Sequence, residues 1–472
     1  MDGGGTWRAA QRAPAGRRAV VAGASLAGLL AARVLAEQFD EVLLVDREAL
    51  PAGNAHRRTT PHSWHAHGLL ARGREALEQL FPGITEEWLA QGGRCGDAQR
   101  NVAFYAGRQR FAPGDSGIGG VAVGRVVIEG SVRRRVLALP RVRVLAPLRV
   151  LGPLWDAAER RVRGLCVAPD EDGGTAFEIP ADLVVDATGR GSRLPQWLAG
   201  LGFPVPDEER VHSDIRYATA YFERRSDELP GLEVVLGTAT ADHPRPAVLI
   251  GQEQDRWVVT LAGYGADAPP LDRAGFAARA AASVPEIAAV VGAGRFLDEP
   301  RGYRFPHSQR RRVERLARWP RGLLALGDAL CSFNPIYGQG MSVAAAEALA
   351  LREELAGARE GLEQRVLRRA AQIIDTPWTT AAGADLAIPA VEGERPLPVR
   401  LVNGYLARLF QAAGTDPAVG RAFLAVAHLL ASPATLFAPA LLWRVFRAAG
   451  RGAALPRTAA PHRSPRQSPA PW

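Results

Sequence analysis

The sequence predicts an α/β fold in which a Rossmann-like nucleotide-binding domain is interrupted by a mostly antiparallel β-sheet domain and followed by a helical region. Three observations support this prediction. An apolar strand, a tight turn, a helix and a second strand follow one another from Arg18, which is the order of a βαβ unit. Alternating apolar and polar residues between Val211 and Gly263 favour an antiparallel sheet. After Leu351 the chain is rich in Ala, Arg and Leu and has helical spacing.

The composition is that of a globular protein with enough length for about two or three hydrophobic cores. The 472 residues are 47% hydrophobic and 23% charged, with a formal net charge of +9. Apart from histidine, every basic residue is an arginine, because the sequence contains no lysine. This indicates a compositional bias more than a nucleic-acid-binding surface. The lack of lysine also excludes Schiff-base catalysis and the phosphate-binding lysine of nucleoside triphosphate loops.

The three cysteines, Cys95, Cys166 and Cys331, are odd in number, far apart and without the spacing of metal ligands. They predict neither a disulfide framework nor a metal site, and they fit a reduced, cytoplasmic protein. The polar, arginine-containing residues before Arg18 lack the apolar segment of a secretory signal. The last residues are rich in proline and basic, a composition that predicts disorder.

One apolar run, Ala422 to Trp443, has no formal charge over a length that could span a bilayer. Pro433 and Pro439 interrupt it and favour two short helices. We therefore expect the run to pack against the body of the protein. Contact with a membrane surface and a true membrane span are the alternatives.

The predicted βαβ unit carries a dinucleotide-binding fingerprint in its turn. Gly23 permits the tight turn and Gly28 permits close packing of the helix, while Ser25 stands where the middle glycine is usual. A small serine still lets a pyrophosphate approach the helix N-terminus. Asp46 follows the second strand, where such units place the acid that binds a ribose. A βαβ unit with a purely structural role is the alternative.

Two later blocks are predicted to extend the same sheet. One strand ends at Asp186 before a Gly-rich turn, and a helix is predicted to begin near Arg125. The stretch Leu323–Met341 predicts a buried strand, Asp328 at its end, an Asn-Pro pair and two glycines that open a helix. An acid there can bind a polyol, and the helix N-terminus can stabilise negative charge on a ring that approaches the glycines. In a structural alternative, Asp328 only caps a helix.

The chain resembles single-component FAD-dependent monooxygenases with the para-hydroxybenzoate hydroxylase fold in three blocks, which read GASLAGLLAARVLAEQFDEVLLVDRE, DLVVDATGRGSRLPQWLAGLG and LLALGDALCSFNPIYGQGMSVAAAEA. It is most similar in kind to actinobacterial epoxidases and hydroxylases of natural-product pathways. The resemblance spans about residues 18 to 351. It implies one FAD-binding domain of the glutathione-reductase type, which NAD(P)H visits transiently as reductant without a second fingerprint.

The resemblance also implies where FAD binds. Gly23, Ser25 and Gly28 would surround the pyrophosphate, and Asp46 would hold the adenosine ribose. Arg125 would reach the phosphate or ribose side. The other implied contacts are Asp328 with the ribityl chain and, along the pyrimidine edge of the flavin, Pro335, Gly338, Gly340 and Met341.

One segment departs from the family pattern. Relatives tend to carry an Arg-Lys-Gly-Val-Pro-Gln segment followed by an Arg-His-x-His run, where this chain reads RRTTPHSWHAHGLL. His62 replaces the Gln and Trp64 replaces the Arg, whereas His65 and His67 keep their places. His65, His67 and Pro335 are the catalytic candidates, although the two histidines can equally be packed or capping residues.

The implied activity is that of an FAD-dependent monooxygenase. NAD(P)H would reduce the flavin, molecular oxygen would add at its C4a carbon, and the hydroperoxyflavin would epoxidise or hydroxylate a hydrophobic small molecule of secondary metabolism. An alkene needs no acid–base pair for this reaction. Hydroxylation of a phenol would benefit from a general base, but the sequence does not single out any carboxylate of the predicted antiparallel sheet for that role.

Three other functions are alternatives to a monooxygenase. A flavin-dependent reductase of a polyprenyl or other alkene is similar in its FAD-binding blocks and is the main alternative. A flavin-dependent halogenase shares the fold but uses an active-site lysine and a Trp-rich motif, and this sequence has neither. A nucleotide-binding protein without activity would have no use for motifs at the flavin edge.

The predicted domain boundaries follow from these blocks. They are a disordered leader at 1–17, the FAD-binding domain at 18–200 and 300–360, the substrate domain at 201–299, the C-terminal helical region at 361–452 and a disordered tail at 453–472. We expect a cytoplasmic protein that could be peripheral to a membrane through the apolar run 422–443.

Overall fold

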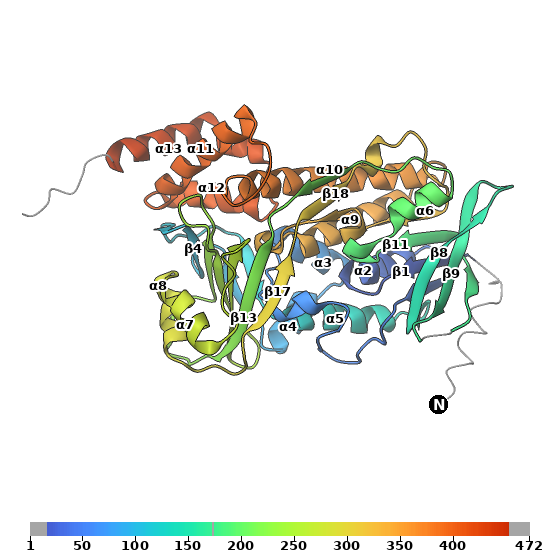
Figure 1. Cartoon of the computed structure of the whole chain (residues 1–472), viewed down its shortest axis with the longest axis horizontal. Coiled ribbons are helices and arrows are strands. Elements are labelled where there is room, and N and C mark those ends of the chain that lie inside the picture. Colours follow the sequence, from blue (N-terminus) through green and yellow to red (C-terminus); the bar gives the residue numbers. More distant parts are fainter. Residues whose placement is uncertain (1–16, 172–173, 453–472) are drawn as a thin grey trace, which may run out of the picture.

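The computed structural model describes residues 17–171 and 174–452. Figure 1 shows an elongated molecule with a parallel sheet toward one end, a larger mixed sheet toward the other, and the C-terminal helices along one side. This arrangement confirms the predicted fold class. The tail predicted for 453–472 and, apart from Arg17, the leader predicted for 1–17 lie outside the described residues.

The predicted nucleotide-binding domain contains a sheet of five parallel strands. They are β1 Arg18–Ala22, β2 Glu41–Val45, β7 Val142–Leu145, β11 Leu183–Asp186 and β19 Leu323–Ala325. Their order in the sheet is β19-β11-β1-β2-β7, with every pair parallel. Because parallel strands end at the same edge, the segments that follow β1, β2, β11 and β19 meet there.

Helices cover one face of the parallel sheet, and a small antiparallel sheet covers the other (Figure 1). Alternate residues of β1 point to these two layers, so Val21 packs with the helices and Val20 packs with the small sheet. The helices are α2 Leu26–Leu35, α3 Ala71–Leu80, α4 Ile84–Ala90, α5 Arg125–Leu137 and α9 Gly340–Leu355. The small sheet consists of β8 Leu148–Asp156, β9 Arg161–Pro169 and β10 Phe177–Pro180.

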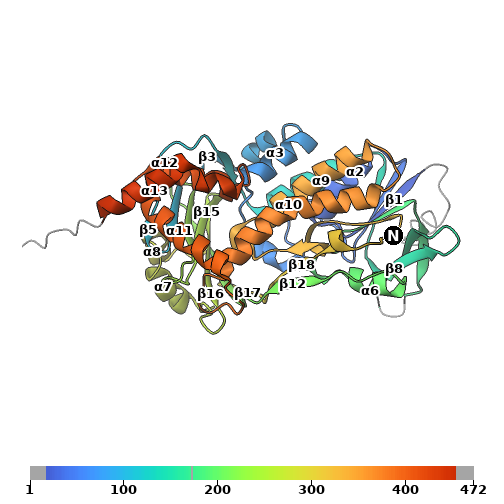
Figure 2. The same cartoon turned by 90° about the horizontal axis from the view of Figure 1, so that it is seen from above.

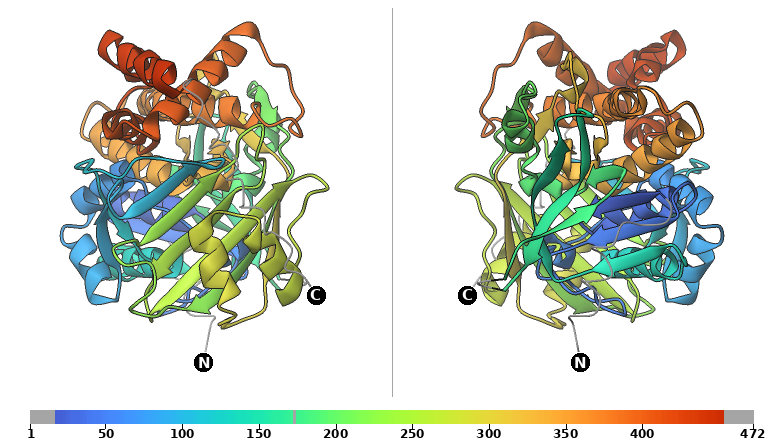
Figure 3. Two further views of the ribbon diagram at one scale, coloured as in Figure 1. Left: turned by 90° about the vertical axis from the view of Figure 1, so that its left-hand side faces the viewer. Right: turned by 90° about the vertical axis from the view of Figure 1, so that its right-hand side faces the viewer.

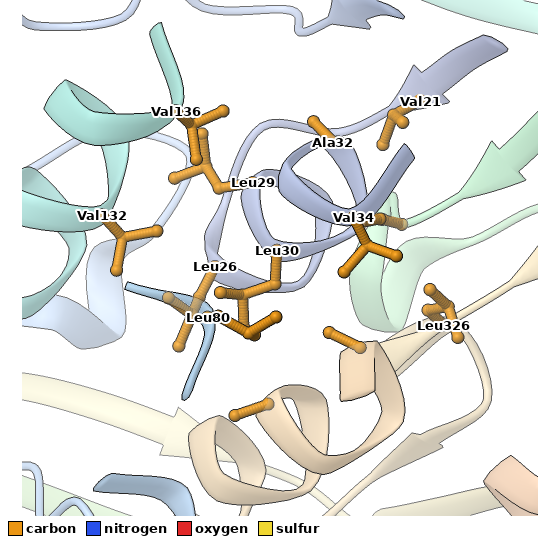
Figure 4. Packing of buried hydrophobic residues seen from close by; sticks show 14 of the residues in the cluster. Val21, Leu26, Leu29, Leu30, Ala32, Val34, Leu80, Val132, Val136 and Leu326 are labelled. Atoms are coloured by element: carbon orange, nitrogen blue, oxygen red, sulfur yellow. The ribbon is translucent and has the colours of Figure 1, made fainter. Parts of the chain in front are cut away.

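The centre of this helical layer is α2. Figure 4 shows its side chains between β1, α5 and the end of α3. Leu29 and Leu30 are fully buried and meet Val132 and Val136 of α5 and Leu80 of α3 in one apolar cluster. The apolar residues of α2 lie on nearly all sides, which suits a helix that is enclosed by the sheet, α5 and α9.

The larger sheet has seven strands in the order β17-β13-β16-β15-β14-β4-β5. They are β4 Val102–Ala106, β5 Gln109–Arg110, β13 Ile215–Glu223, β14 Val234–Thr238, β15 Ala247–Gln252, β16 Arg256–Tyr264 and β17 Arg301–Phe305. The sheet is mostly antiparallel, as predicted, but β14 pairs with β4 in parallel. It therefore extends beyond the range 201–299, because β4, β5 and β17 join from outside it. Strands that are so far apart in the sequence leave no local signal from which their pairing could be predicted.

Shorter elements flank and connect the two sheets. Helices α7 Arg273–Ala281 and α8 Pro285–Gly292 pack on one face of the seven-stranded sheet. The remaining elements are α6 Leu194–Gly200, the pair β3 Arg94–Asp97 and β6 Gly119–Ala122, and the small sheet of β12 Glu208–Val211, β18 Ser308–Arg311 and β20 Cys331–Ser332.

The C-terminal region is helical, as predicted. Its elements are α10 Leu362–Asp385, α11 Leu397–Ala413, α12 Pro417–Ala427, the 3-10 turn η6 Pro433–Phe437 and α13 Pro439–Gly452. Figure 2 shows α10 running beside α9 toward the seven-stranded sheet, and the left view of Figure 3 shows the later helices above that sheet.

The apolar run 422–443 packs against the body of the protein. Leu424, Leu436 and Leu441 are buried in one cluster with Phe104 of β4. The run is interrupted as predicted, because η6 begins at Pro433 and α13 at Pro439. Among the helices in the described part of the chain, none is long and apolar enough to cross a bilayer.

Gly28→Ala tests the backbone contact that closes the first turn. The new Cβ atom would lie 1.8 Å from the carbonyl oxygen of Gly23, so α2 would have to shift. We expect a loss of about 1 to 3 kcal/mol, measured as a lower midpoint of thermal unfolding. Gly292→Ala, at the end of α8 with no atom within 4 Å of the new Cβ, is the control and should not lower the midpoint. Equal midpoints for both variants would contradict this account of the turn.

Candidate cofactor site and substrate cavity

The turn between β1 and α2, together with the start of this helix, contains three of the predicted residues, Gly23, Ser25 and Gly28. Gly23 has a φ of +100°, and a Cβ atom there would lie 2.3 Å from the carbonyl oxygen of Ala187. Ser25 precedes the first turn of α2, but its side chain does not cap the helix. No other side chain in the described ranges accepts a hydrogen bond from the first amides of α2 either, and free amides suit a helix N-terminus to an anion.

Asp46 lies beside this turn and is engaged by protein groups. Its Oδ2 atom accepts a hydrogen bond from the Ala24 amide at 2.7 Å, and its Oδ1 atom accepts one from the Arg57 guanidinium at 2.8 Å. Arg57 also donates to the Ala24 carbonyl oxygen at 2.9 Å. The side chain of Asp46 is 8% exposed, so contact with a ribose would require Arg57 to move. The ribose contact stays a prediction.

Asp328 lies at the same edge of the sheet, directly after β19. The 3-10 turn η4 Gly327–Ala329 carries it, and Gly327 has a φ of +63°. The side chain of Asp328 is exposed, yet burial by its surroundings raises the pKa of its carboxyl group, while the positive charges of Arg125 and Arg190 oppose that rise. The carboxylate of Asp328 is therefore accessible to solvent, although many protein atoms, including those of Arg125 and Arg190, surround it.

Arg125 and Arg190 have hydrogen-bonding capacity that no group in the described part of the chain uses. The Nε atom of Arg125 and one Nη atom of Arg190 are buried and have no partner among these residues. Arg125 begins α5, as predicted, and its guanidinium lies 3.4 Å from the Glu129 carboxylate. Two such cations beside an exposed carboxylate suit a ligand that carries both phosphates and hydroxyls.

The loop after Asp328 leads to the N-terminus of α9. It contains the 3-10 turn η5 Pro335–Tyr337, and Gly338 then takes a φ of +64°, which explains this glycine. A Cβ atom at Gly340 would meet nothing within 4 Å, so the protein itself does not require glycine there. The Met341 side chain is buried in the core, which leaves only its backbone to face a ligand.

A cavity of about 1390 Å³ opens beside this loop. Its walls come from β4, β14 and β15 of the seven-stranded sheet, from the segment 62–70, from the loop 335–339 and from α10, α11 and α12. Most of the lining side chains are apolar. The volume exceeds the range of about 300 to 1,000 Å³ that is usual for small-molecule sites, so the cavity can hold a large hydrophobic molecule.

The predicted catalytic candidates His65, His67 and Pro335 all line this cavity. Burial lowers the pKa of His65 to about 4 and that of His67 to about 3. The Nδ1 atom of His65 lies 2.7 Å from the Thr219 hydroxyl, and His67 Nδ1 donates to the His65 carbonyl oxygen at 2.8 Å. Both rings are therefore neutral near pH 7. They can exchange hydrogen bonds with a ligand there but not a permanent charge.

The structure adds a buried carboxylate that the sequence did not single out. Asp385, the last residue of α10, is fully buried, and its Oδ1 atom accepts hydrogen bonds from Asn334 at 2.9 Å and from the Tyr337 hydroxyl at 2.8 Å. Tyr217 in turn donates to the Asn334 side chain at 3.1 Å. Burial raises the pKa of Asp385 to about 6. This network connects the helical region to the loop before α9 and to the cavity wall.

One oxygen of the Asp385 carboxylate and the hydroxyl of Tyr264 are buried, and neither has a hydrogen-bond partner within residues 17–171 and 174–452. Tyr264 lines the cavity, and burial together with the nearby Asp385 raises its pKa. Unpaired polar atoms at a cavity wall are available to a polar group of a ligand. Sequence reasoning missed Asp385 because it lies in an ordinary helical stretch, whereas Asn334 is next to the Pro335 that was recognised.

The fold defined by these elements is that of known flavin-dependent enzymes. The chain is similar to a flavoprotein/dehydrogenase from Cytophaga hutchinsonii, with a TM-score of 0.68 and 17% identity, over 92% of this chain and 99% of the other. The flavin-dependent brominase Bmp2 gives a TM-score of 0.65 and 14% identity, again over 92% and 99%. The p-nitrophenol 4-monooxygenase PnpA from Pseudomonas putida DLL-E4 gives 0.62 and 18%, over 88% and 99%. The chain thus has the fold of FAD-dependent monooxygenases and halogenases.

The chain belongs to the family of Protein Rv3254 from Mycobacterium tuberculosis (strain ATCC 25618 / H37Rv). The two sequences are 33% identical over 429 residues, which cover 88% of this chain and 90% of the relative. No protein-family model matches the chain. The name of the relative states no activity, so the function has to be argued from the site.

Asp385→Asn tests whether a buried charge forms near neutral pH. A carboxyl group whose pKa rises on folding stabilises the protein most below its unfolded pKa, and that stabilisation is lost as the pH rises through about 6. The variant cannot ionise. The difference in unfolding free energy, variant minus parent, should therefore be larger at pH 8 than at pH 5 by about 1 to 2 kcal/mol, because only the parent loses stability over this range. Thermal unfolding at both pH values measures this difference, and an equal difference at both would show that Asp385 does not ionise in this range.

Proposed function

We propose that the protein is a flavin-dependent oxidoreductase and, more specifically, an FAD-dependent monooxygenase that uses NAD(P)H and molecular oxygen to oxygenate a hydrophobic small molecule. One observation supports this most strongly. The loop 335–340 borders the large cavity and also opens α9. A ring held at the N-terminus of α9 would therefore lie beside a substrate in the cavity.

The residues of the site fit FAD. The turn Gly23–Gly28 offers free helix amides to a pyrophosphate, and the unpartnered nitrogen atoms of Arg125 and Arg190 offer further donors to its phosphates or hydroxyls. Asp328 offers an exposed carboxylate to the ribityl hydroxyls. Gly340 leaves room for a ring. When bound, FAD would accept hydride from NAD(P)H and supply the oxygen chemistry.

The protein's own residues would orient the substrate, exclude water and manage protons. The apolar walls of the cavity would keep water away from the reacting atoms. The neutral rings of His65 and His67 would contribute hydrogen bonds without charge. Asp385, with a pKa of about 6 and a hydrogen bond from Tyr337, would accept a proton through that tyrosine if the substrate were a phenol or an enol.

The other functions have less support from the site. A reductase of a polyprenyl or other alkene would use the same FAD-binding residues, and it is the second candidate because the cavity is large and apolar. Oxygen uptake during NAD(P)H turnover separates it from a monooxygenase. The similarity to the brominase Bmp2 concerns the fold, and a halogenase that depends on an active-site lysine is excluded because the sequence has no lysine.

Asp328→Ala should weaken FAD binding, because a ribityl hydroxyl loses a charged acceptor worth about 1.5 to 3 kcal/mol. The dissociation constant should rise about tenfold to a hundredfold, measured by flavin fluorescence during titration of the apoprotein. Asp227→Ala is the control, because Asp227 has a side chain that is 75% exposed and pairs only loosely with Arg225 at 3.5 Å. An unchanged dissociation constant for the Asp328 variant would place the ribityl chain elsewhere.

Gly340→Val should impair both FAD binding and flavin reduction. A side chain at this position would push the ring away from the first amides of α9, and loss of one aligned donor typically costs about 2.7 to 4 kcal/mol in rate. With FAD in excess, reduction by NADPH should slow about a hundredfold, and the reduction potential of the bound flavin should fall. Gly292→Val, at the exposed end of α8, is the control. Parent-like potential and rate in the Gly340 variant would mean that α9 does not face the ring.

A further inference from the structure

The outer side of the last helices carries exposed apolar residues that the cavity does not use. In α11, Leu397 is 62% and Leu401 is 65% exposed, and in α13, Trp443 is 59% and Phe446 is 50% exposed. None of these four residues lines the cavity, so each is exposed on the outer surface. We refer to them, with the arginines described next, as the outer face of α11 and α13. Figures 1 and 2 show these two helices as the outermost layer at one end of the molecule.

The two helices form one continuous surface. Helix α11 packs beside α13, and the guanidinium of Arg408 on α11 lies 5.7 Å from the ring centroid of Phe446 on α13. On α13 itself, the Arg447 guanidinium lies 4.7 Å from the ring centroid of Trp443. The apolar residues and the arginines are therefore interleaved on the same surface.

The charge of this region is strongly one-sided. From Arg395 to Gly452 the sequence has seven arginines and a single acidic residue, Asp416. Asp416 is already paired with Arg444 at 2.8 Å. Arg408 and Arg447 are exposed and do not line the cavity, and no acidic partner in the described part of the chain lies within ion-pair distance of them. A surface that combines aromatic and aliphatic side chains with unpaired arginines is complementary to a bilayer with anionic headgroups.

The inner side of α11 borders the substrate cavity. Val399, Leu406 and Phe410 line it, while Leu397 and Leu401 of the same helix face outward. The side of η6 that carries Leu436 and Phe437 also lines the cavity. At α11, the wall between the cavity and the outer face is thus a single helix.

We propose that the outer face of α11 and α13 docks on the surface of an anionic lipid bilayer, and that this places the cavity beside the lipid from which an apolar substrate would be drawn. The use of the surface for substrate rests on the proposed function, whereas the docking itself does not. A second copy of this chain is a poorer occupant, because a symmetric contact would bring the arginines of one copy against those of the other.

Vesicle binding by the full-length protein tests this proposal. The protein should co-sediment with vesicles of phosphatidylcholine containing phosphatidylglycerol and bind poorly to phosphatidylcholine alone, and salt should weaken the binding. The double variant Trp443→Ser with Phe446→Ser should lower the partition coefficient at least tenfold. Leu297→Ser, at an exposed leucine of the same kind (56% exposed) outside the C-terminal helices, is the matched control and should bind like the parent.

A second variant tests the electrostatic part without touching an apolar residue. Arg408→Gln with Arg447→Gln should weaken binding to the anionic vesicles by about fivefold per arginine. Parent-like binding by both double variants would overturn the proposal, and so would equal binding to neutral and anionic vesicles. A dimer in sedimentation that dissociates in these variants would assign the face to a second copy. Because these assays need no FAD, NADPH or substrate, their failure is distinguishable from failure of the proposed activity.

Discussion

Parallel pairing of β19 with β11, and of β11 with β1, is the constraint on which the whole site depends. It brings Leu323–Ala325 beside Leu183–Asp186 and thereby close to the first strand. The amide of Leu326 donates to the Asp186 carbonyl oxygen at 3.0 Å, which continues the pairing to the point where Asp328 emerges. The fingerprint turn and the acid thus share one edge of the sheet, although they are separated by most of the chain.

The start of α9 is fixed by the same geometry. A buried Glu347 on α9 accepts a hydrogen bond from the Gly327 amide at 2.7 Å, so the helix is tied back to the end of β19. Helix α9 also packs on α2 in the helical layer. The N-termini of α2 and α9 are consequently held by one core, and a cofactor that contacts both would bind a preformed surface and not one assembled on binding.

The C-terminal helices are part of the site because they close the cavity and supply Asp385. This carboxylate joins α10 to the Asn334 and Tyr337 side chains, so a change in its charge acts directly on the loop before α9. A buried carboxylate with one unpaired oxygen costs stability whenever it is ionised. Its presence at this junction agrees with a role in handling protons more than with a role in stability alone.

The sequence predicted those features whose cause is local. The backbone of one turn requires Gly23 and Gly28. The strand, the acid, the glycines and the helix after Leu323 follow one another directly along the chain, so a short stretch of sequence is enough to predict them. Features that depend on distant contacts were not predictable in this way. Asp385 and Arg57 acquire their partners only in the folded chain, and β4 pairs with a strand far along the sequence. The exposure of Leu401 and Trp443 likewise depends on how α11 and α13 pack.

A crystal structure of the protein with FAD is the measurement that tests the central claim most directly. The account predicts one FAD per chain, with its pyrophosphate at the turn Gly23–Gly28, its ribityl chain at Asp328 and its ring between the N-terminus of α9 and the large cavity. Absence of FAD from crystals grown at saturating FAD, or a flavin ring bound away from Gly340, would contradict it.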